Sequence, residues 1–264
     1  MSGALAGKRA FISGSSSGIG AATARLFARE GAKVFVHGRN PERTEAVAKE
    51  IGSESSWKTA DLRDGAAADA LIAAVHEQLG GVDILVNNAG GETAADGAID
   101  WLSVTPEDFA AAYNANLISA VRMIRAFAPG MKERGWGRII QISSGIAHYP
   151  TPNMPDYSAA KSAMNTTTES LAKALARTGV TVNTISPGLM LTPSVEGWLR
   201  GIAKKANWGD DLATIEKKAT ERIAANLVGR LGRAEDIANT VLFLAGEGAS
   251  FINGEDIRVT GGHL

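Results

Sequence analysis

Short apolar runs alternate with amphipathic stretches along the whole chain. Most of the apolar runs lack the polar alternation of a half-exposed strand, which is typical of strands covered on both faces. On this basis strands are predicted at Arg9–Ser13, Lys33–His37, Ser56–Ala60, Asp83–Asn87, Gly137–Ser143, Thr181–Ser186 and Asp256–Val259.

The stretches between these runs carry helical signals. The first, from Gly18 to Glu30, has one apolar face and ends at Gly31. Asn40-Pro41 and Thr105-Pro106 each place a capping side chain before a proline at the first helical position. Strand and helix alternate without a linker or repeat. This alternation predicts an α/β fold, a single-domain, Rossmann-type doubly wound parallel sheet with helices on both faces, spanning residues 1–264.

One stretch breaks the alternation. Residues 192–226 lie between the sixth predicted strand and a final helix at about Ala234–Ala245. They contain two helix-like pieces, the first of which carries Trp198, Leu199, Ile202 and Trp208. Functional loops gather beyond the carboxyl ends of strands in such sheets, so this insertion is predicted to be a small helical substrate lid.

Composition and charge exclude several classes of protein. The chain has 27 basic and 28 acidic residues without a block of like charges, which argues against a nucleic-acid partner. It has no cysteine, and its four histidines lack the spacing of metal ligands, so no metal site is predicted. No apolar run is long enough to span a membrane, and Met1–Lys8 lead into a strand pattern instead of a signal peptide. A cytoplasmic location without a membrane partner is expected.

A glycine-rich turn follows the first predicted strand and opens the first helix. It reads Gly14-Ser15-Ser16-Ser17-Gly18-Ile19-Gly20, a G-x-x-x-G-x-G spacing instead of the more common G-x-G-x-x-G. Glycines let the backbone turn sharply and approach a pyrophosphate, whose charge is stabilised at a helix N-terminus. The same letters could form an ordinary tight loop, but their place between a strand and a helix favours dinucleotide binding.

The end of the second predicted strand indicates which dinucleotide is bound. NAD-binding sites usually have an acidic residue there for the ribose 2′-hydroxyl, and here Gly38 stands in its place with Arg39 next to it. A guanidinium binds a phosphate dianion through a planar fork of donors. NADP is therefore the favoured cofactor. NAD is the alternative, and in that case Arg39 would be only a solvated loop residue.

Tyr157 and Lys161 carry the strongest signal of chemistry. Residues four apart share one face of a helix, so an ammonium group lies beside a phenol. Free tyrosine ionises near pH ~10, and a fixed positive charge nearby favours the phenolate. Such a tyrosine can act as a general acid or base, although the same spacing also occurs on solvated helices.

With these residues and several further motifs in chain order, the sequence resembles the short-chain dehydrogenase/reductase family over essentially its full length. The further motifs are Asp61-Leu62, Asn87-Asn88-Ala89-Gly90, Asn116, Ser144 thirteen residues before Tyr157, and Pro187-Gly188 with Thr192. Two positions depart from the usual pattern. Ser13 stands where a threonine is more usual, and Ser17 stands where NADP-dependent members often carry a basic residue.

The resemblance implies roles for individual residues. Ser144 would hydrogen-bond the substrate carbonyl, and Tyr157 would transfer the proton. Lys161 would hold the nicotinamide ribose, and Asn116 would position Lys161 through a water molecule. The implied catalytic set is therefore Asn116, Ser144, Tyr157 and Lys161. The residues implied to bind cofactor are Gly14, Ser16, Ser17, Gly18, Ile19, Gly20, Arg39, Asp61, Leu62, Asn88, Ala89, Gly90, Tyr157, Lys161, Pro187, Gly188, Leu189 and Thr192. Those expected to contact substrate are Ser144, Ile146, Tyr157, Met190 and Trp198.

Three functions stay open at this level. The first is an NADP-dependent oxidoreductase that transfers hydride between nicotinamide and a carbonyl, such as a ketone or 3-oxoacyl thioester. The second is a dehydrogenase for a sugar, polyol or other secondary alcohol. The third is a catalytically silent cofactor-binding sensor, against which the complete Asn-Ser-Tyr-Lys set argues.

Partners beyond a small-molecule substrate are less determined. Arg134, Arg138 and Arg177 are available for an acidic acyl carrier protein, but the sequence does not place them at the pocket. Helices around Phe109–Glu133 and Tyr157–Arg177 are rich in alanine. Family members assemble on such helices, so a homo-oligomer is implied, a dimer or a homotetramer.

Overall fold

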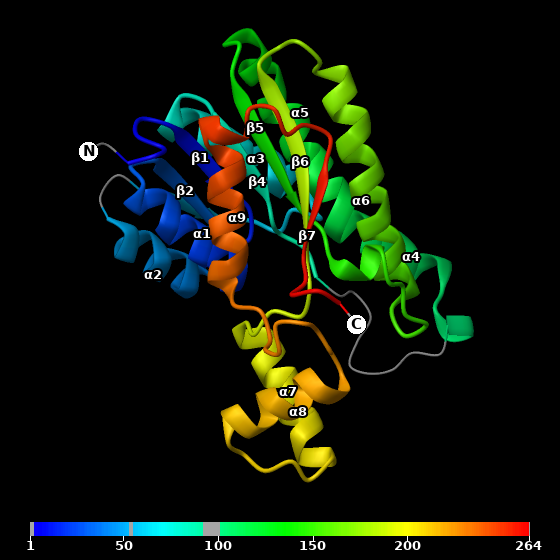
Figure 1. Cartoon of the computed structure of the whole chain (residues 1–264). Coiled ribbons are helices and arrows are strands. Elements are labelled where there is room, and N and C mark those ends of the chain that lie inside the picture. The colour runs from blue at the N-terminus through cyan, green and yellow to red at the C-terminus, as the bar shows by residue number, and fades with distance from the viewer. Residues whose placement is uncertain (1–2, 53–54, 92–100, 264) are drawn as a thin grey trace.

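The computed structural model describes residues 3–52, 55–91 and 101–263 (Figure 1). Within these residues, seven strands form one parallel sheet in the order β3-β2-β1-β4-β5-β6-β7. The strands are β1 (Arg9–Ile12), β2 (Lys33–Gly38), β3 (Ser56–Thr59), β4 (Ile84–Asn87), β5 (Gly137–Ile142), β6 (Val180–Pro187) and β7 (Asp256–Val259). They lie close to the predicted runs, and the predicted fold class is confirmed.

Helices cover both faces of the sheet. One face carries α1 (Gly18–Arg29), α2 (Pro41–Ile51) and α9 (Ala234–Ala245), and the other carries α3 (Gly65–Leu79), α5 (Ser119–Glu133) and α6 (Pro155–Ala174) (Figure 1). Successive strand residues point to opposite faces. Ile12 of β1 therefore belongs to the same core as Phe27 of α1, whereas its neighbour Phe11 contacts Phe127 of α5, with the ring centroids 5.5 Å apart.

The long helix predicted around Phe109–Glu133 is divided into α4 (Pro106–Tyr113), a π-helical turn η2 (Asn114–Ile118) and α5. Asn116 lies in this turn and is fully buried. Its Nδ2 donates to the carbonyl oxygens of Ala112 and Gly91, both at 3.0 Å. A π turn adds one residue to the helical repeat, so the 3.6-residue pattern of the sequence does not predict it.

The segment predicted as a lid contains α7 (Pro193–Lys205) and α8 (Leu212–Arg222). These helices project from the sheet near the C-terminus and have a small core of their own that includes Leu199, Trp208 and Ile215 (Figure 1). Trp208 was expected on the first helix but lies beyond it, because α7 ends at Lys205 and Asn207 adopts a left-handed conformation with φ 55°. That these helices close over a substrate stays a prediction.

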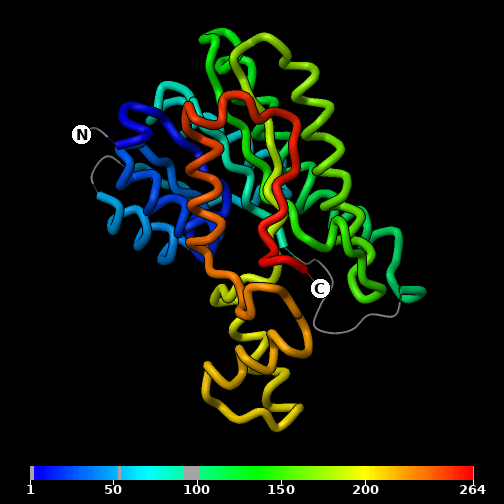
Figure 2. Tube along the Cα trace, in the orientation of Figure 1, coloured from blue at the N-terminus to red at the C-terminus, as the bar shows by residue number. Residues whose placement is uncertain are grey.

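The residues that follow β7 lie beside the base of this segment, as the trace in Figure 2 shows. The N–H groups of Leu227 and Val228 donate to the carbonyl oxygens of Gly262 and Gly261, at 2.9 and 3.1 Å. The remaining elements are 3-10 turns at Trp101–Ser103 (η1), Gly145–Ala147 (η3) and Glu247–Ala249 (η4). Among the described residues, no helix is long and apolar enough to cross a membrane.

Candidate active site

The glycine turn between β1 and α1 has the shape that a dinucleotide requires. Gly14 and Gly18 adopt positive φ angles of 67° and 53°, which favour glycine. A Cβ on Gly20 would overlap the carbonyl oxygen of Gly14, so only glycine lets the first turn of α1 lie this close to the loop. A turn of this kind at a helix N-terminus is one that a pyrophosphate can approach.

Ser13 and Asn88 hold this loop against the end of β4. Ser13 Oγ accepts from the N–H groups of Asn88 and Ala89, at 3.0 and 2.9 Å. Asn88 Nδ2 donates back to the carbonyl oxygens of Ser13 and Gly14, at 3.0 and 3.1 Å. Asn88 and Ala89, expected to bind cofactor, thus support the turn that would receive it. Ser13 was not among the predicted site residues, although its place before Gly14 is a usable signal.

At the adenosine end, Gly38 closes β2 directly beside the glycine turn. A Cβ on Gly38 would overlap Ser16 Oγ and would come within 2.5 Å of Thr44 Oγ1. An aspartate, the usual NAD determinant, would thus collide with Ser16. Arg39 follows and is exposed to solvent.

Asp61 at the end of β3 has a partner that sequence reasoning missed. Arg63 Nε lies 3.0 Å from both Asp61 carboxylate oxygens, and its Nη2 lies 2.5 Å from Oδ2. The hydrogen bonds from Arg63 lower the pKa of Asp61 to about 2, and the charge of Arg39 contributes in the same direction. Leu62 is 5% exposed and packs in the core, so a contact of this residue with adenine would come from its backbone.

The segment after β6, which is expected at the nicotinamide, lies near the glycine turn and the segment after Ser144. A Cβ on Gly18 would lie 3.3 Å from Thr192 Cγ2, which places Thr192 against the cofactor turn. A Cβ on Gly145 would lie 3.2 Å from the Pro187 carbonyl oxygen, and Gly188 packs against Thr260. Thr192 thus lies against the glycine turn and Pro187 against the segment after Ser144. That these residues lie beside a nicotinamide stays a prediction.

The proposed catalytic side chains come from three elements. Ser144 precedes η3 and is half-buried, and its Oγ accepts from Ile146 N–H at 3.4 Å. Tyr157 and Lys161 lie one turn apart on α6, with Lys161 Nζ 5.6 Å from the centre of the Tyr157 ring. A Cβ on Gly90 would be 2.5 Å from Asn116 Oδ1 and 3.5 Å from Lys161 Nζ, so both polar groups face Gly90.

Lys161 is buried and has a perturbed pKa. Its side chain is 3% exposed, and its Nζ donates to the Ile142 carbonyl oxygen at 2.8 Å. Burial lowers the pKa of Lys161 to about 8, because the ammonium has lost its water. A lysine in this state carries its charge at neutral pH beside Tyr157 but holds the proton less firmly than a surface lysine.

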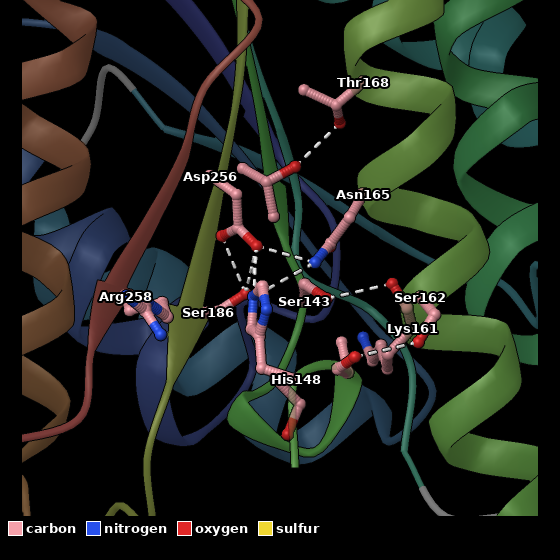
Figure 3. Close-up of polar contacts among 12 residues, drawn as sticks. Ser143, His148, Lys161, Ser162, Asn165, Thr168, Ser186, Asp256 and Arg258 are labelled. Atoms are coloured by element: carbon pink, nitrogen blue, oxygen red, sulfur yellow. Dashed lines mark hydrogen bonds and ion pairs between the residues drawn. The ribbon is translucent and has the colours of Figure 1, made fainter. Parts of the chain in front are cut away.

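A polar cluster centred on Asp256 clamps the turn that carries Ser144 (Figure 3). Ser186 Oγ and Asn165 Nδ2 donate to the Asp256 carboxylate, at 2.7 and 2.6 Å. His148, the residue that ends η3, lies with its Nε2 2.6 Å from Asp256 Oδ2. The start of β7 thus holds a turn more than a hundred residues earlier in the chain, and no local pattern signals this.

We expect Asp256→Asn to lower kcat about ten-fold and to leave the KM for the cofactor within about two-fold, since a looser Ser144 turn acts on the substrate side. The NH2 group that replaces one carboxylate oxygen donates and cannot accept, so the single remaining oxygen cannot serve all three neighbours. Steady-state kinetics of this variant and of Glu255→Gln, which changes an exposed neighbouring carboxylate, would measure the effect. Equal kcat values for the two variants would contradict the clamp.

The residues expected to contact substrate are less closely grouped. Ile146 is partly buried two residues after Ser144, and Trp198 is half-exposed on α7. Met190, also expected at the substrate, is 6% exposed and packs against Gly232 in the core, which leaves its side chain little surface for a substrate. Within the described residues, no group of three or more His, Cys, Asp or Glu could hold a metal ion.

A doubly wound sheet with this glycine turn, and a buried lysine one turn from a tyrosine after β5, defines a dinucleotide-dependent oxidoreductase. Comparison with protein families agrees, since the family model described as enoyl-(acyl carrier protein) reductase matches residues 14–263. The chain belongs to the short-chain dehydrogenase/reductase family. The predicted family is thereby confirmed, as is its enzyme class, which acts on CH–OH and C=O groups with a nicotinamide cofactor.

Individual relatives cover nearly the whole chain. An uncharacterised oxidoreductase of Bacillus subtilis is 38% identical over 97% of this chain and 95% of its own length. A putative ketoacyl reductase of Streptomyces coelicolor is 35% identical over 96% of this chain and 95% of its own length. Among solved structures, L-sorbose reductase from Gluconobacter frateurii in complex with NADPH and L-sorbose is 32% identical, with a TM-score of 0.90 over 99% of this chain and 98% of that one.

Proposed function

We propose that this protein reduces a ketone with NADPH as its preferred hydride donor. The observation that carries the cofactor choice is the packing of Ser16 against Gly38, which leaves no room for the acidic residue of an NAD site, with the exposed Arg39 beside it. The L-sorbose reductase of similar fold binds NADPH, which supports the same choice.

The residues present fit a nicotinamide dinucleotide. Gly14, Gly18 and Gly20 would hold its pyrophosphate, Arg39 its 2′-phosphate, and Thr192 its nicotinamide side. When bound, the cofactor supplies the hydride. The charge on Lys161 and the hydroxyl of Ser144 favour negative charge on a carbonyl oxygen nearby, and Tyr157 supplies the proton that this oxygen takes up.

The substrate class we favour is a ketone such as a 3-oxoacyl thioester. The similarity to a putative ketoacyl reductase over nearly the whole chain supports it. A keto sugar is the second candidate, because the L-sorbose reductase structure matches with a TM-score of 0.90. A silent sensor is the weakest alternative, since the Asn116, Ser144, Tyr157 and Lys161 set is complete and Lys161 is buried beside Tyr157.

We also propose that the protein works as a homo-oligomer, a homotetramer, in the cytoplasm. Phe251 is fully exposed and Phe243 on α9 is 52% exposed, and large apolar side chains in such positions favour contact with a second copy. The absence of cysteine suits a reducing compartment.

Initial rates with NADPH and NADH against acetoacetyl thioesters, keto sugars and cyclic ketones would test the proposal. We expect faster turnover with NADPH, and we expect Arg39→Ala to raise the KM for NADPH by roughly ten- to a hundred-fold while leaving that for NADH unchanged, because a charge-assisted phosphate contact is lost. Arg29→Ala, at the exposed far end of α1, is the matched control. Equal use of both cofactors by the parent protein would refute the NADPH preference.

A further inference from the structure

His37 is a buried histidine that the catalytic mechanism does not use. It lies at the end of β2 and is 2% exposed. Its Nδ1 is 3.1 Å from the Gly14 nitrogen, and its Nε2 is 3.1 Å from the Ala60 carbonyl oxygen. A backbone N–H only donates and a carbonyl oxygen only accepts, so Nδ1 is the acceptor and Nε2 carries the proton. The two contacts together select one neutral tautomer of the ring.

The backbone of His37 is joined to the same loop. Its N–H donates to Ser15 Oγ at 2.9 Å, and its carbonyl oxygen accepts from Ser15 N–H at 2.7 Å. Ser15 Oγ in turn donates to the Ile12 carbonyl oxygen at 2.7 Å. Gly14 is therefore held from two sides, its N–H by the His37 ring and its carbonyl oxygen by Asn88.

These contacts join three segments that would surround the adenosine half of a dinucleotide. The glycine turn begins at Gly14, the residues that replace the NAD acid follow His37, and Asp61 follows Ala60. We propose that His37 is a positioning residue for the cofactor: its neutral imidazole bridges Gly14 and Ala60 and sets the distance between the pyrophosphate turn and the adenine side of the site. This role rests on the dinucleotide binding of the proposed function.

The electrostatic surroundings keep the ring neutral at working pH. Burial lowers the pKa of His37 to about 4, and this effect exceeds the opposing influence of the Ala60 carbonyl. Asp61 and Arg39 are the charged groups facing the ring, and Asp61 raises the pKa while Arg39 lowers it. A protonated ring would point an N–H at the N–H of Gly14 and break the bridge.

The test is to measure how tightly His37→Phe binds NADPH. Binding is monitored by energy transfer from tryptophan to NADPH, without any carbonyl substrate. Phenylalanine keeps the ring that contacts Phe11 and removes both hydrogen bonds. We expect the Kd for NADPH to rise about ten-fold and kcat at saturating NADPH to change by less than about two-fold. His37→Asn keeps an oxygen that can accept from the Gly14 N–H. Its Kd for NADPH should therefore lie between those of the parent protein and His37→Phe.

Phe35→Leu is the matched control, because Phe35 lies two residues earlier on β2, is fully buried and also contacts Phe11. We expect this variant to lose thermal stability while its Kd for NADPH stays within about two-fold of the parent protein. An unchanged Kd in folded His37→Phe, or a loss confined to kcat, would overturn the proposal. Because NADPH binding is measured without a substrate, the result can be interpreted even if the protein does not reduce the proposed class of ketones.

A measurement on the unaltered protein applies even where His37→Phe does not fold. In protein labelled with ¹⁵N, a coupling between the Gly14 nitrogen and His37 Nδ1 across their hydrogen bond is expected from about pH 5 to about pH 8, with the ring proton on Nε2. The coupling should persist when NADPH is added. A proton on Nδ1, or no coupling in a ring shown to be ordered, would overturn the bridge.

Discussion

Tyr157→Phe is expected to lower kcat by roughly a thousand-fold, within the range that loss of a general acid produces. Ser144 can hydrogen-bond a carbonyl oxygen, and Lys161 is buried with its Nζ committed to the Ile142 carbonyl. Neither Ser144 nor Lys161 can therefore take over the proton transfer from the missing Tyr157 hydroxyl. The phenyl ring keeps the contact with Lys161, whose Nζ lies 5.6 Å from the ring centre, so the Kd for NADPH should change by less than about two-fold.

Single-turnover oxidation of bound NADPH would separate the chemical step from cofactor binding. Tyr113→Phe is the matched control, since it also removes a phenol hydroxyl and Tyr113 packs against the core cluster of Leu117 and Met164. The control should retain kcat within about two-fold. If both variants turned over at the parent rate, the assignment of Tyr157 as proton donor would be wrong.

Lys161→Met is expected to remove nearly all activity and yet to make the protein more stable. Activity falls by at least about a hundred-fold because the positive charge beside Tyr157 is lost. Stability rises because the ammonium is buried, and a pKa lowered from 10.5 to about 8 corresponds to a cost on the order of 3 kcal/mol in the charged form. The Ile142 carbonyl loses its donor, which costs about 1 to 3 kcal/mol, so a net gain of up to about 2 kcal/mol is expected.

The pH dependence gives an independent check. The pKa of Lys161 is lower in the folded than in the unfolded protein, so between about pH 8 and 10.5 the unfolded chain binds more protons. The contribution of Lys161 to stability therefore becomes more favourable as pH rises through this window, and its full cost is present below about pH 8.

Urea unfolding near pH 7 and near pH 9.5 would measure this contribution as the difference between the parent protein and Lys161→Met. The stability advantage of the variant should shrink at the higher pH. Lys173→Met, on the exposed end of the same helix, should show no such change. An equal advantage of Lys161→Met at both pH values would contradict the lowered pKa.

Local patterns in the amino-acid sequence were sufficient for the order of the elements. Apolar runs and capping residues depend on near neighbours, so the seven strands and the start of α1 at Gly18 follow from them. The spacing of Tyr157 and Lys161 is likewise local, because four residues make one turn of α6. The residues Asn88, Ser144 and Thr192 were named from the resemblance to family motifs, which are short runs of neighbouring residues.

Contacts between distant segments were decided only by the folded chain. His37 bridges Gly14 and Ala60, and Asp256 holds the turn after Ser144, each across strands whose register no local pattern specifies. The apolar pattern assigns a residue to a face but not to a neighbour, so Met190 was expected at the substrate and packs in the core instead. Burial, which lowers the pKa values of Lys161 and His37, is a property of the assembled layers and not of either residue's neighbours in the chain.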